Sequence, residues 1–260
     1  STGKTTLSNS LKKIFGDKFT QEILGDDYHN WERTSDNWKN QTHLNPKSNN
    51  LLKLTNDLRE MINGNSIYSK KYDHKTGKFE IPKIKNSSDF IIVNGLHTLF
   101  SKQLRNLFNI KIFMEMNSEL KIKLKTYRDY NIRKKDLNTI QESIVKRFSD
   151  YDNYIYPQKE LANIVFYLDL DNPSLINEDL IKNNKLKLKL NVGIKNCLYY
   201  QELHSVLNNI SSLNIQISNI DSASNVNFDI QGDPTVDEIT NSSKILIPQI
   251  EEIMDVNSKF

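Results

Sequence analysis

The chain of 260 residues is 37% hydrophobic and 26% charged, a composition that excludes collagen-like, coiled-coil and repeat architectures. Its apolar runs, such as residues 91–93, are far shorter than the roughly 20 residues that span a bilayer. No secretory signal pattern opens the sequence, and the single cysteine, Cys197, excludes an internal disulfide. We therefore expect a cytoplasmic protein of one or two domains with no membrane contact.

The charge is unevenly distributed along the chain. The net charge is +3, but residues 201–260 carry −7 and residues 1–200 carry +10. This asymmetry predicts a basic part that binds anions. Because the basic residues are mixed with acidic ones and lack the aromatic-interleaved stripe of a nucleic-acid-binding surface, we expect a small phosphorylated ligand and no nucleic acid.

The first hundred residues alternate between predicted helices and strands. A Gly-Lys-Thr turn at residues 3–5 leads into an amphipathic helix at 7–15, and a short strand follows at 19–24. A second helix at 51–62 is stopped by Gly64. Residues 72–77 have the composition of a loop. The apolar run at 90–93, interrupted by Asn94-Gly95, predicts a strand buried on both faces of a parallel sheet.

The same alternation continues to about residue 170. We expect a short helix near 104–107, a strand at 110–114, helices at 118–133 and 136–148, and a strand at 164–168. Short apolar strands alternating with helices predict an α/β doubly wound fold with a mostly parallel sheet.

The polar stretch around residues 170–184 is the expected domain boundary. It would divide a first domain at 1–170 from a small α+β domain at 175–260. In the second part we expect a strand at 185–192, a helix at 199–210, two strands within 214–230 and a helix at 235–254. No motif in this part indicates chemistry.

The opening Gly3-Lys4-Thr5 matches the second half of a P-loop, G-x-x-x-x-G-K-[ST]. In that motif backbone N–H groups surround phosphates, the lysine neutralises them and the hydroxyl binds Mg²⁺. A bare G-K-T also arises by chance, but here it runs directly into a helix whose N-terminus attracts anions. We therefore assign Gly3, Lys4, Thr5 and Thr6 to nucleotide binding, and we expect the first glycine and the first strand to precede Ser1.

Asp26, Asp27, His29 and Arg33 follow the predicted strand at 19–24. Open α/β sheets bind ligands at the carboxyl ends of their strands. There a carboxylate can accept a hydroxyl proton, and His29 with Arg33 can hold an anion. The alternative is a pair of aspartates that caps a loop.

A third group lies on the predicted helix at 118–133. The spacing places Lys125, Arg128 and Asp129 on one face, with Arg133 a turn further on. The alternative is a solvated helix with ion pairs between residues four apart. Histidines in separate loops, His43, His74 and His97, have no spacing typical of a zinc site.

Together these segments resemble the phosphoribulokinase and uridine kinase family of P-loop kinases from residue 1 to about 168. Uridine kinases usually have an aromatic residue in place of His29 and lack a Gly-Leu-His run such as that at residues 95–97, so the phosphoribulokinase branch is the more similar. The shared motifs are Leu24-Gly25-Asp26-Asp27-Tyr28-His29, Arg33-Thr34, Thr42-His43-Leu44-Asn45-Pro46 with Asn49, Tyr72-Asp73-His74-Lys75-Thr76-Gly77, Gly95-Leu96-His97, Tyr127-Arg128-Asp129 with Arg133, and Tyr154-Ile155-Tyr156-Pro157-Gln158-Lys159.

The resemblance implies a P-loop NTPase-like fold, ATP and Mg²⁺ as cofactors, and a role for each motif. Asp26 would be the general base, and Asp129 would act in catalysis or bind the metal together with Thr5. Arg128 and Arg133 would belong to a mobile region over the nucleotide. Substrate binding would fall to His29, Arg33, Tyr72, His97 and Lys125.

One departure affects the expected activity. The family usually has a metal-binding glutamate where this chain has Asn94, so turnover is expected to be slower. We predict an ATP-dependent kinase that phosphorylates a pentose-containing substrate, with ribulose 5-phosphate the first choice and uridine or cytidine the alternative. A hypothesis of another class is a nucleotide-binding protein with little catalysis. Oligomeric state is left open, with dimerisation through residues 175–260 one option.

Overall fold

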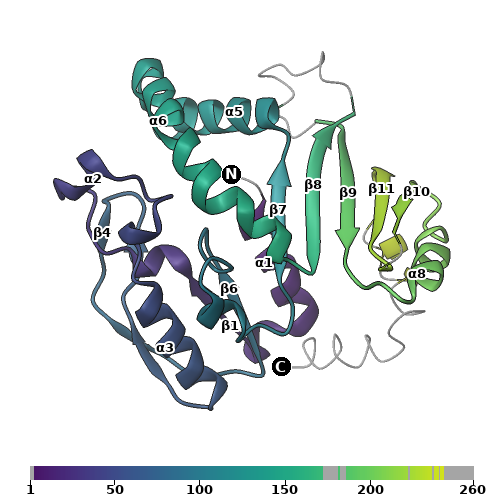
Figure 1. Cartoon of the computed structure of the whole chain (residues 1–260), viewed down its shortest axis with the longest axis horizontal. Helices are drawn as coiled ribbons and strands as arrows, with labels where there is room; N and C mark the ends of the chain where they lie inside the picture. The colour runs from purple at the N-terminus through teal and green to yellow at the C-terminus, as the bar shows by residue number, and fades with distance from the viewer. Residues whose placement is uncertain are drawn as a thin grey trace. The chain divides into compact units, whose positions relative to one another are not determined.

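A computed structural model describes residues 3–171, 181, 186–221, 223–235, 237–239 and 241–242. Figure 1 labels the helices and strands of the chain. The chain divides into two compact units. We call residues 4–111 and 142–161 the N-terminal unit, and residues 1–3, 112–141 and 162–260 the C-terminal unit. Among the described residues, no helix combines the length and the apolarity that crossing a bilayer requires.

The N-terminal unit is built around a parallel pair of strands. Helix α1 (Lys4–Phe15) leads through a 3₁₀ turn at Asp17–Phe19 into β1 (Thr20–Leu24), which pairs with β6 (Phe90–Asn94). The register places Leu24 opposite Asn94. The helix and both strands were expected, but β6 is not buried on both faces, because Phe90 is exposed and the rest of the strand is half-buried.

Helix α3 (Leu51–Ile62) supplies most of the core of this unit. It begins where the Asn50 side chain accepts a hydrogen bond from Lys53 N, and it ends just before Gly64, whose φ is +85°. Its leucines recur at helical spacing, so one face packs against Ile23 of β1. The fully buried cluster contains Ile23, Leu54, Leu58, Met61 and Leu104.

The remaining elements of this unit are short. The 3₁₀ turn η2 (Gly25–Tyr28) follows β1, and α2 (Asn37–Asn40) and η3 (Pro46–Ser48) precede α3. Two antiparallel pairs come next, β2 (Ile67–Ser69) with β5 (Lys83–Lys85), and β3 (Tyr72–Asp73) with β4 (Lys78–Phe79). The segment expected as a loop at 72–77 is therefore a hairpin with a turn at its tip. The unit is completed by α4 (Lys102–Arg105), a π-helical turn (Tyr151–Ile155) and a 3₁₀ helix (Tyr156–Leu161).

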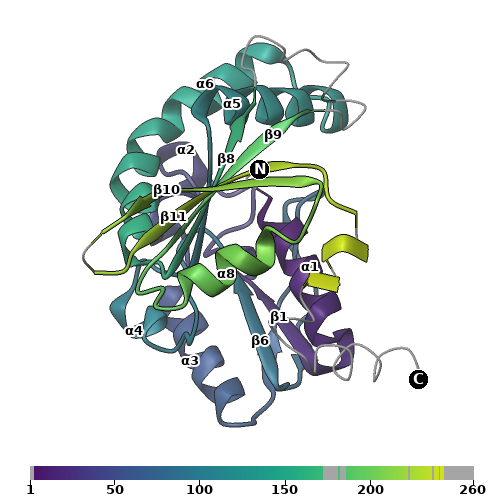
Figure 2. The same cartoon turned by 90° about the vertical axis from the view of Figure 1, so that its right-hand side faces the viewer.

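The C-terminal unit contains a five-stranded sheet in the order β10-β11-β9-β8-β7. Strands β7 (Ile112–Met116) and β8 (Ile164–Leu170) are parallel, whereas β9 (Leu188–Ile194), β11 (Val226–Gly232) and β10 (Leu213–Ile220) extend the sheet antiparallel. Figure 2 shows α8 (Tyr200–Leu207) lying across one face of the antiparallel strands. Its apolar side packs on a cluster around Val226 and Phe228.

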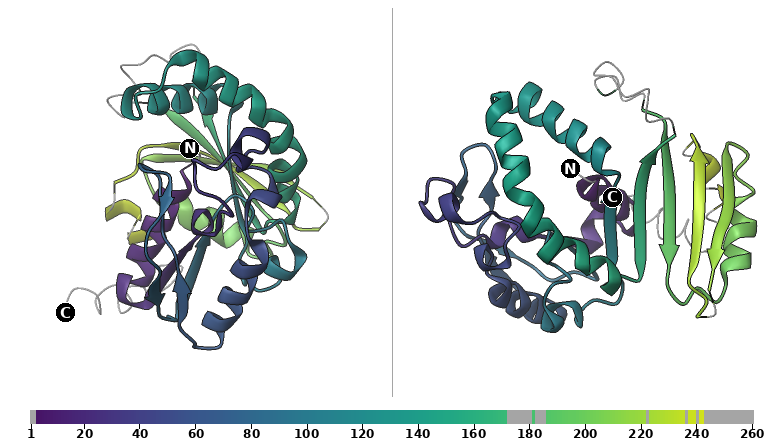
Figure 3. Two further views of the ribbon diagram at one scale, coloured as in Figure 1. Left: turned by 90° about the vertical axis from the view of Figure 1, so that its left-hand side faces the viewer. Right: turned by 45° about the horizontal axis from the view of Figure 1, so that its top comes forward.

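The helix predicted over 118–133 is interrupted. It consists of α5 (Ser118–Tyr127) followed by a π-helical turn, η4 (Arg128–Ile132), after which α6 (Leu137–Asp150) begins. Figure 3 shows the chain turning from α5 into α6. Such π turns widen a helix by one residue and are frequent at functional sites, so the local geometry around Asp129 differs from that of a regular helix.

The α/β class with parallel strand pairs is confirmed. The expected boundary near residue 170 lies between two paired strands of one sheet, because β8 precedes it and β9 follows it. A first domain at 1–170 and a second at 175–260 stay a prediction, while the compact units divide the chain differently. The helix expected at 235–254 is helical at 237–239 and 241–242, and residues 243–254 lie outside the described part.

Candidate active site

Two glycines bring the ends of β1 and β6 together. A Cβ built on Gly25 would lie 3.0 Å from the Cα of Gly95, and one built on Gly95 would lie 3.0 Å from the Cα of Gly25. Side chains at these positions would push the two turns apart. This close approach lets the residues after each strand, Asp26 and His97, line one narrow pocket, together with Asn49.

Asp26 lies in η2, at the carboxyl end of β1, with 38% of its side chain exposed. Its Oδ2 is 3.2 Å from His74 Nε2, and its Oδ1 is 3.7 Å from His29 Nε2. Burial raises the pKa of Asp26, but the His74 hydrogen bond and the nearby imidazoles outweigh burial and lower that pKa to about 2. The carboxylate is therefore ionised at neutral pH and partly open to an incoming group.

Three of the histidines near Asp26, namely His29, His43 and His97, favour their neutral forms. Burial lowers the pKa of His29, of His43 to about 3 and of His97 to about 4. His29 Nδ1 is 2.8 Å from Asn49 Oδ1, which orients the ring. At neutral pH these rings therefore act as hydrogen-bonding groups, and His29 supplies less positive charge than the sequence interpretation assumed.

Arg33 and Tyr72 meet at the β3–β4 hairpin. Arg33 donates from Nη2 to the carbonyl oxygen of His74 at 2.7 Å and from its backbone N to Gly77 O at 2.8 Å. Gly77 has φ +73°, and a Cβ there would lie 2.5 Å from the Cβ of Arg33, so only glycine fits. The Tyr72 ring packs edge-on against His29 and His74, with centroids 5.1 and 5.3 Å apart.

His97, which lines the same pocket, has an unsatisfied buried polar atom. The residue is 4% exposed, and its Nδ1 is buried with no hydrogen-bond partner, while Nε2 is 3.3 Å from His43 O. Gln158 holds the loop that presents it, accepting from Leu99 N at 3.0 Å and donating to Leu96 O at 2.9 Å. Because buried polar atoms normally have partners, the geometry fits a hydroxyl-bearing ligand or a water at Nδ1.

The opening turn lies near the same edge of the strand pair. Lys4 begins α1, and Ser8, one turn on, accepts a hydrogen bond from Asn94 Nδ2 at 3.2 Å. Asn94 is the last residue of β6 and pairs with Leu24, two residues before Asp26. The first turns of α1, with the partial positive charge of a helix N-terminus, thus lie at the strand ends that carry Asp26.

Asp129 forms a separate group in the C-terminal unit, on the π turn. Its side chain is 3% exposed and contacts three cations: Lys125 Nζ at 2.8 Å, Arg128 Nη2 at 2.9 Å and Arg133 Nη1 at 3.2 Å. Burial raises the pKa of Asp129, but the hydrogen bond from Lys125 and the charge of Arg128 outweigh it and lower the pKa to about 2. The structure thus brings together all four residues of this predicted group.

Sequence reasoning missed several residues of the site. His74 was set aside as a loop histidine, yet it contacts Asp26, and Asn49 and Gln158 entered only within shared motifs. No local periodicity predicts such contacts, because they join segments that are tens of residues apart. Of the predicted nucleotide-binding residues, Lys4, Thr5 and Thr6 lie in the first turn of α1, directly after Gly3, whereas Arg128 and Arg133 lie at the two ends of the π turn.

Comparison with known proteins supports the resemblance. The family model "Phosphoribulokinase / Uridine kinase family" matches residues 1–171. A phosphoribulokinase of Synechocystis sp. (strain ATCC 27184 / PCC 6803 / Kazusa) is 31% identical over 163 residues, which are 63% of this chain and 49% of that protein. A uridine kinase of Clostridium novyi (strain NT) is 28% identical over 179 residues, 63% of this chain and 80% of that protein.

The fold is also similar to a solved structure. The structure of phosphoribulokinase from Rhodobacter spheroides superposes with a TM-score of 0.65 at 18% identity, covering 98% of this chain and 95% of that one. At this identity the likeness concerns the fold alone. The chain spans about half the length of the phosphoribulokinases with which it shares sequence, such as that of Synechocystis.

Proposed function

Because the chain belongs to the Phosphoribulokinase / Uridine kinase family, we propose that it is an ATP- and Mg²⁺-dependent kinase of a small pentose-containing substrate. The observation that carries the proposal is the ionised, partly exposed Asp26 carboxylate, held by His74 at the strand ends where α1 begins. Phosphoryl transfer depends on positioning and electrostatics more than on covalent chemistry, and this arrangement offers both.

Each end of the site has a distinct task in this proposal. Backbone N–H groups of Gly3 to Thr6 and the Lys4 ammonium would hold the phosphates of ATP at the N-terminus of α1. Asp26 would accept a hydrogen bond from the acceptor hydroxyl and take its proton as the new P–O bond forms. Arg128 and Arg133 would belong to the region over the nucleotide.

The residues present could hold Mg²⁺ only together with the phosphates of a bound nucleotide, which would supply further ligands. No three histidine, cysteine, aspartate or glutamate side chains in the described part of the chain are grouped to hold a metal ion. Mg²⁺ commonly uses one or two protein oxygens plus substrate phosphates, and the Thr5 hydroxyl is the expected protein ligand. Asp129, the second predicted ligand, has its oxygens on three cations. When bound, the metal would neutralise charge on the transferred phosphoryl group.

The acceptor we propose is a pentose phosphate such as ribulose 5-phosphate. Gly95-Leu96-His97 and His29 are typical of the phosphoribulokinase branch, and Arg33, Lys125 and Arg128 supply charge that a neutral nucleoside does not need. The test is ADP release by the full-length protein with ribulose 5-phosphate, other pentose phosphates, uridine and cytidine. Activity on a sugar phosphate supports the proposal, whereas activity on uridine alone would move the protein to the nucleoside branch.

A second candidate is a nucleotide-binding protein with little catalysis, and Asn94 favours it. The Asn94 amide donates to Ser8 Oγ at 3.2 Å. The family usually has a carboxylate in place of this amide. Asn94→Glu, with Asn94→Gln as a control that keeps the amide, separates the two candidates. We expect an active parent whose ADP release rises with glutamate and not with glutamine. An inactive parent that only glutamate rescues would favour the nucleotide-binding candidate.

A further inference from the structure

Adjacent carboxylates in η2 have opposite surroundings. The Asp26 side chain is 38% exposed, whereas that of Asp27 is 2% exposed. The two therefore leave the same turn on different sides, one toward the pocket and one into the protein. A carboxylate this deeply buried is costly unless its charge and lone pairs are satisfied.

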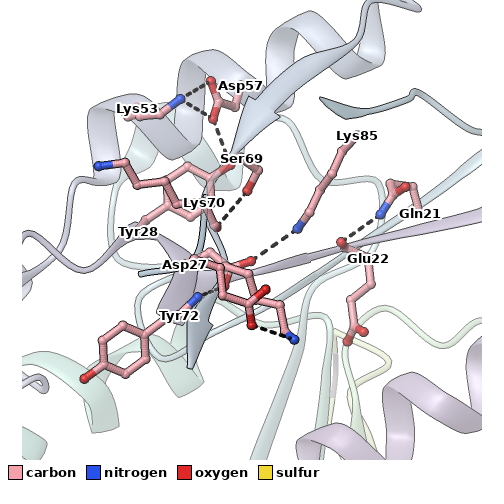
Figure 4. Close-up of polar contacts among 12 residues, drawn as sticks. Gln21, Glu22, Asp27, Tyr28, Lys53, Asp57, Ser69, Lys70, Tyr72 and Lys85 are labelled. Carbon is pink, nitrogen blue, oxygen red and sulfur yellow. Dashed lines mark hydrogen bonds and ion pairs between the residues drawn. The ribbon is translucent and has the colours of Figure 1, made fainter. Parts of the chain in front are cut away.

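The Asp27 carboxylate has a hydrogen-bond donor and a cation as partners, and these come from two segments that are distant from it in the sequence. Its Oδ1 accepts a hydrogen bond from Tyr72 N at 2.9 Å, and its Oδ2 lies 3.2 Å from Lys85 Nζ. Figure 4 shows both contacts as dashed lines. Tyr72 opens β3 and Lys85 closes β5, so one buried side chain ties the turn after β1 to both ends of the segment that contains the hairpin.

The hairpin carries His74 to Asp26. His74 follows Tyr72 by two residues, and its Nε2 is 3.2 Å from Asp26 Oδ2. Glu32 and Arg33 hold the other side of the hairpin, where Glu32 Oε1 accepts from Phe79 N at 3.0 Å and Arg33 N donates to Gly77 O at 2.8 Å. Asp27 is thus the anchor at the base of β3, the strand that leads directly to His74.

We propose that Asp27 is a positioning residue that holds the β3–β4 hairpin so that His74 stays in contact with Asp26. The inference rests on the proposed function for its catalytic consequence, because Asp27 itself touches neither reacting group. Its effect passes through the Tyr72 backbone and Lys85. A displacement of about 1 Å in a catalytic contact can lower turnover about 100-fold, so loss of this anchor is expected to reach kcat.

The first test compares substitutions at Asp27. Asp27→Ala removes both contacts and is expected to lower kcat by up to about 100-fold. Asp27→Asn keeps an oxygen for Tyr72 N and loses the charge opposite Lys85, so its loss of kcat is expected to be smaller. The KM for ATP is expected to stay within about 2-fold, because the nucleotide is held at the start of α1.

Asp57→Asn is the matched control. This carboxylate lies in the same polar cluster of Figure 4, with Tyr28 Oη at 2.9 Å and Lys53 Nζ at 2.7 Å. Its contacts are to η2 and α3 rather than to the hairpin. A kcat within about 2-fold of the parent is expected. An equal loss at both positions would overturn the inference, because it would indicate a general effect of disturbing the cluster.

A double-mutant cycle with His74→Ala tests the route. If Asp27 acts through His74, Asp27→Ala in the His74→Ala background costs no more than about a further 2-fold in kcat. The same cost in both backgrounds would overturn the inference. Asp27→Asn serves in the same cycle if the alanine variant fails to fold.

Hydrogen exchange separates failure of this inference from failure of the proposed function. In Asp27→Asn or Asp27→Ala, the Tyr72 amide is expected to exchange faster than in the parent, whatever the activity. Unchanged exchange would overturn the inference even for an active enzyme, as would faster exchange with unchanged kcat. A parent inactive on every acceptor would overturn the proposed function, and the exchange result would still decide whether Asp27 anchors the hairpin.

Discussion

Asp26 and Asp129 both have a pKa of about 2, but their surroundings reach that value in different ways. Asp26 is 38% exposed and faces imidazoles, of which His74 is the nearest at 3.2 Å. Asp129 is 3% exposed and has three cations within 3.2 Å. One carboxylate has room for an incoming hydroxyl, whereas the oxygens of the other are already engaged.

The difference teaches that ionisation alone does not identify a catalytic base. At Asp129 the charge organises Lys125, Arg128 and Arg133, whose side chains become progressively more exposed, from 14% to 43%. This arrangement fits a carboxylate that presents cations to an anionic ligand. At Asp26 burial favours the neutral forms of His29, His43 and His97, and the carboxylate itself is ionised and partly exposed, which fits the acceptor of a proton.

The largest expected effect is on activity, at Asp26. Asp26→Asn removes the proton acceptor and is expected to lower kcat by about 10²- to 10⁴-fold, while the loss of the partly exposed contact with His74 lowers the free energy of unfolding by about 1 kcal/mol. Steady-state ADP release and urea unfolding measure the two quantities. A variant that retains kcat within a few fold would break the comparison, because Asp26 would then have no special role.

At Asp129, in contrast to Asp26, we expect the large effect to be on the free energy of unfolding. Asp129→Ala leaves the mostly buried Lys125 ammonium and two partly exposed guanidinium groups without their partner, so the free energy of unfolding is expected to fall by about 3 kcal/mol. Glu119→Gln is the control, since Glu119 pairs with Lys123 at 2.9 Å on the exposed side of α5, and about 0.5 kcal/mol is expected there. Equal losses in urea unfolding would show that the burial of Asp129 is not the cause.

A smaller effect, on pH dependence, tests whether His97 is neutral in the folded protein. Burial lowers the pKa of His97 to about 4, so below the unfolded pKa of about 6.5 the unfolded chain binds a proton that the folded chain does not. His97 then stabilises the fold less as pH falls from about 6.5 to 4, by about 1.4 kcal/mol per pH unit. Urea unfolding of His97→Gln across this range should have a shallower slope. An unchanged slope would indicate that His97 is already protonated in the fold.

The sequence alone predicted the elements that local signals define. The leucine spacing and Gly64 located α3 at its observed bounds, and Gly25-Asp26 marked the end of β1. The Lys125 and Asp129 contact also followed from helical spacing.

The features that could not be predicted from the sequence depend mainly on contacts between distant segments. His74 meets Asp26 on a hairpin that Asp27, Glu32 and Arg33 contact from a distant part of the sequence. The antiparallel pairing of β8 with β9 likewise crosses the polar stretch that was expected to separate two domains. The π turn at η4 has no sequence signal in a single chain, since its residues also suit a regular helix.

The central claim is that Asp26 faces the alcohol being phosphorylated while the start of α1 holds the nucleotide. The most direct measurement is a crystal structure of the full-length protein with ADP and the pentose phosphate that it phosphorylates. The account predicts an Asp26 carboxylate oxygen about 2.6–3.2 Å from the acceptor hydroxyl, with the ADP β-phosphate at the backbone N–H groups of residues 3–6. An acceptor bound with its hydroxyl away from Asp26, or a nucleotide bound elsewhere, would contradict it.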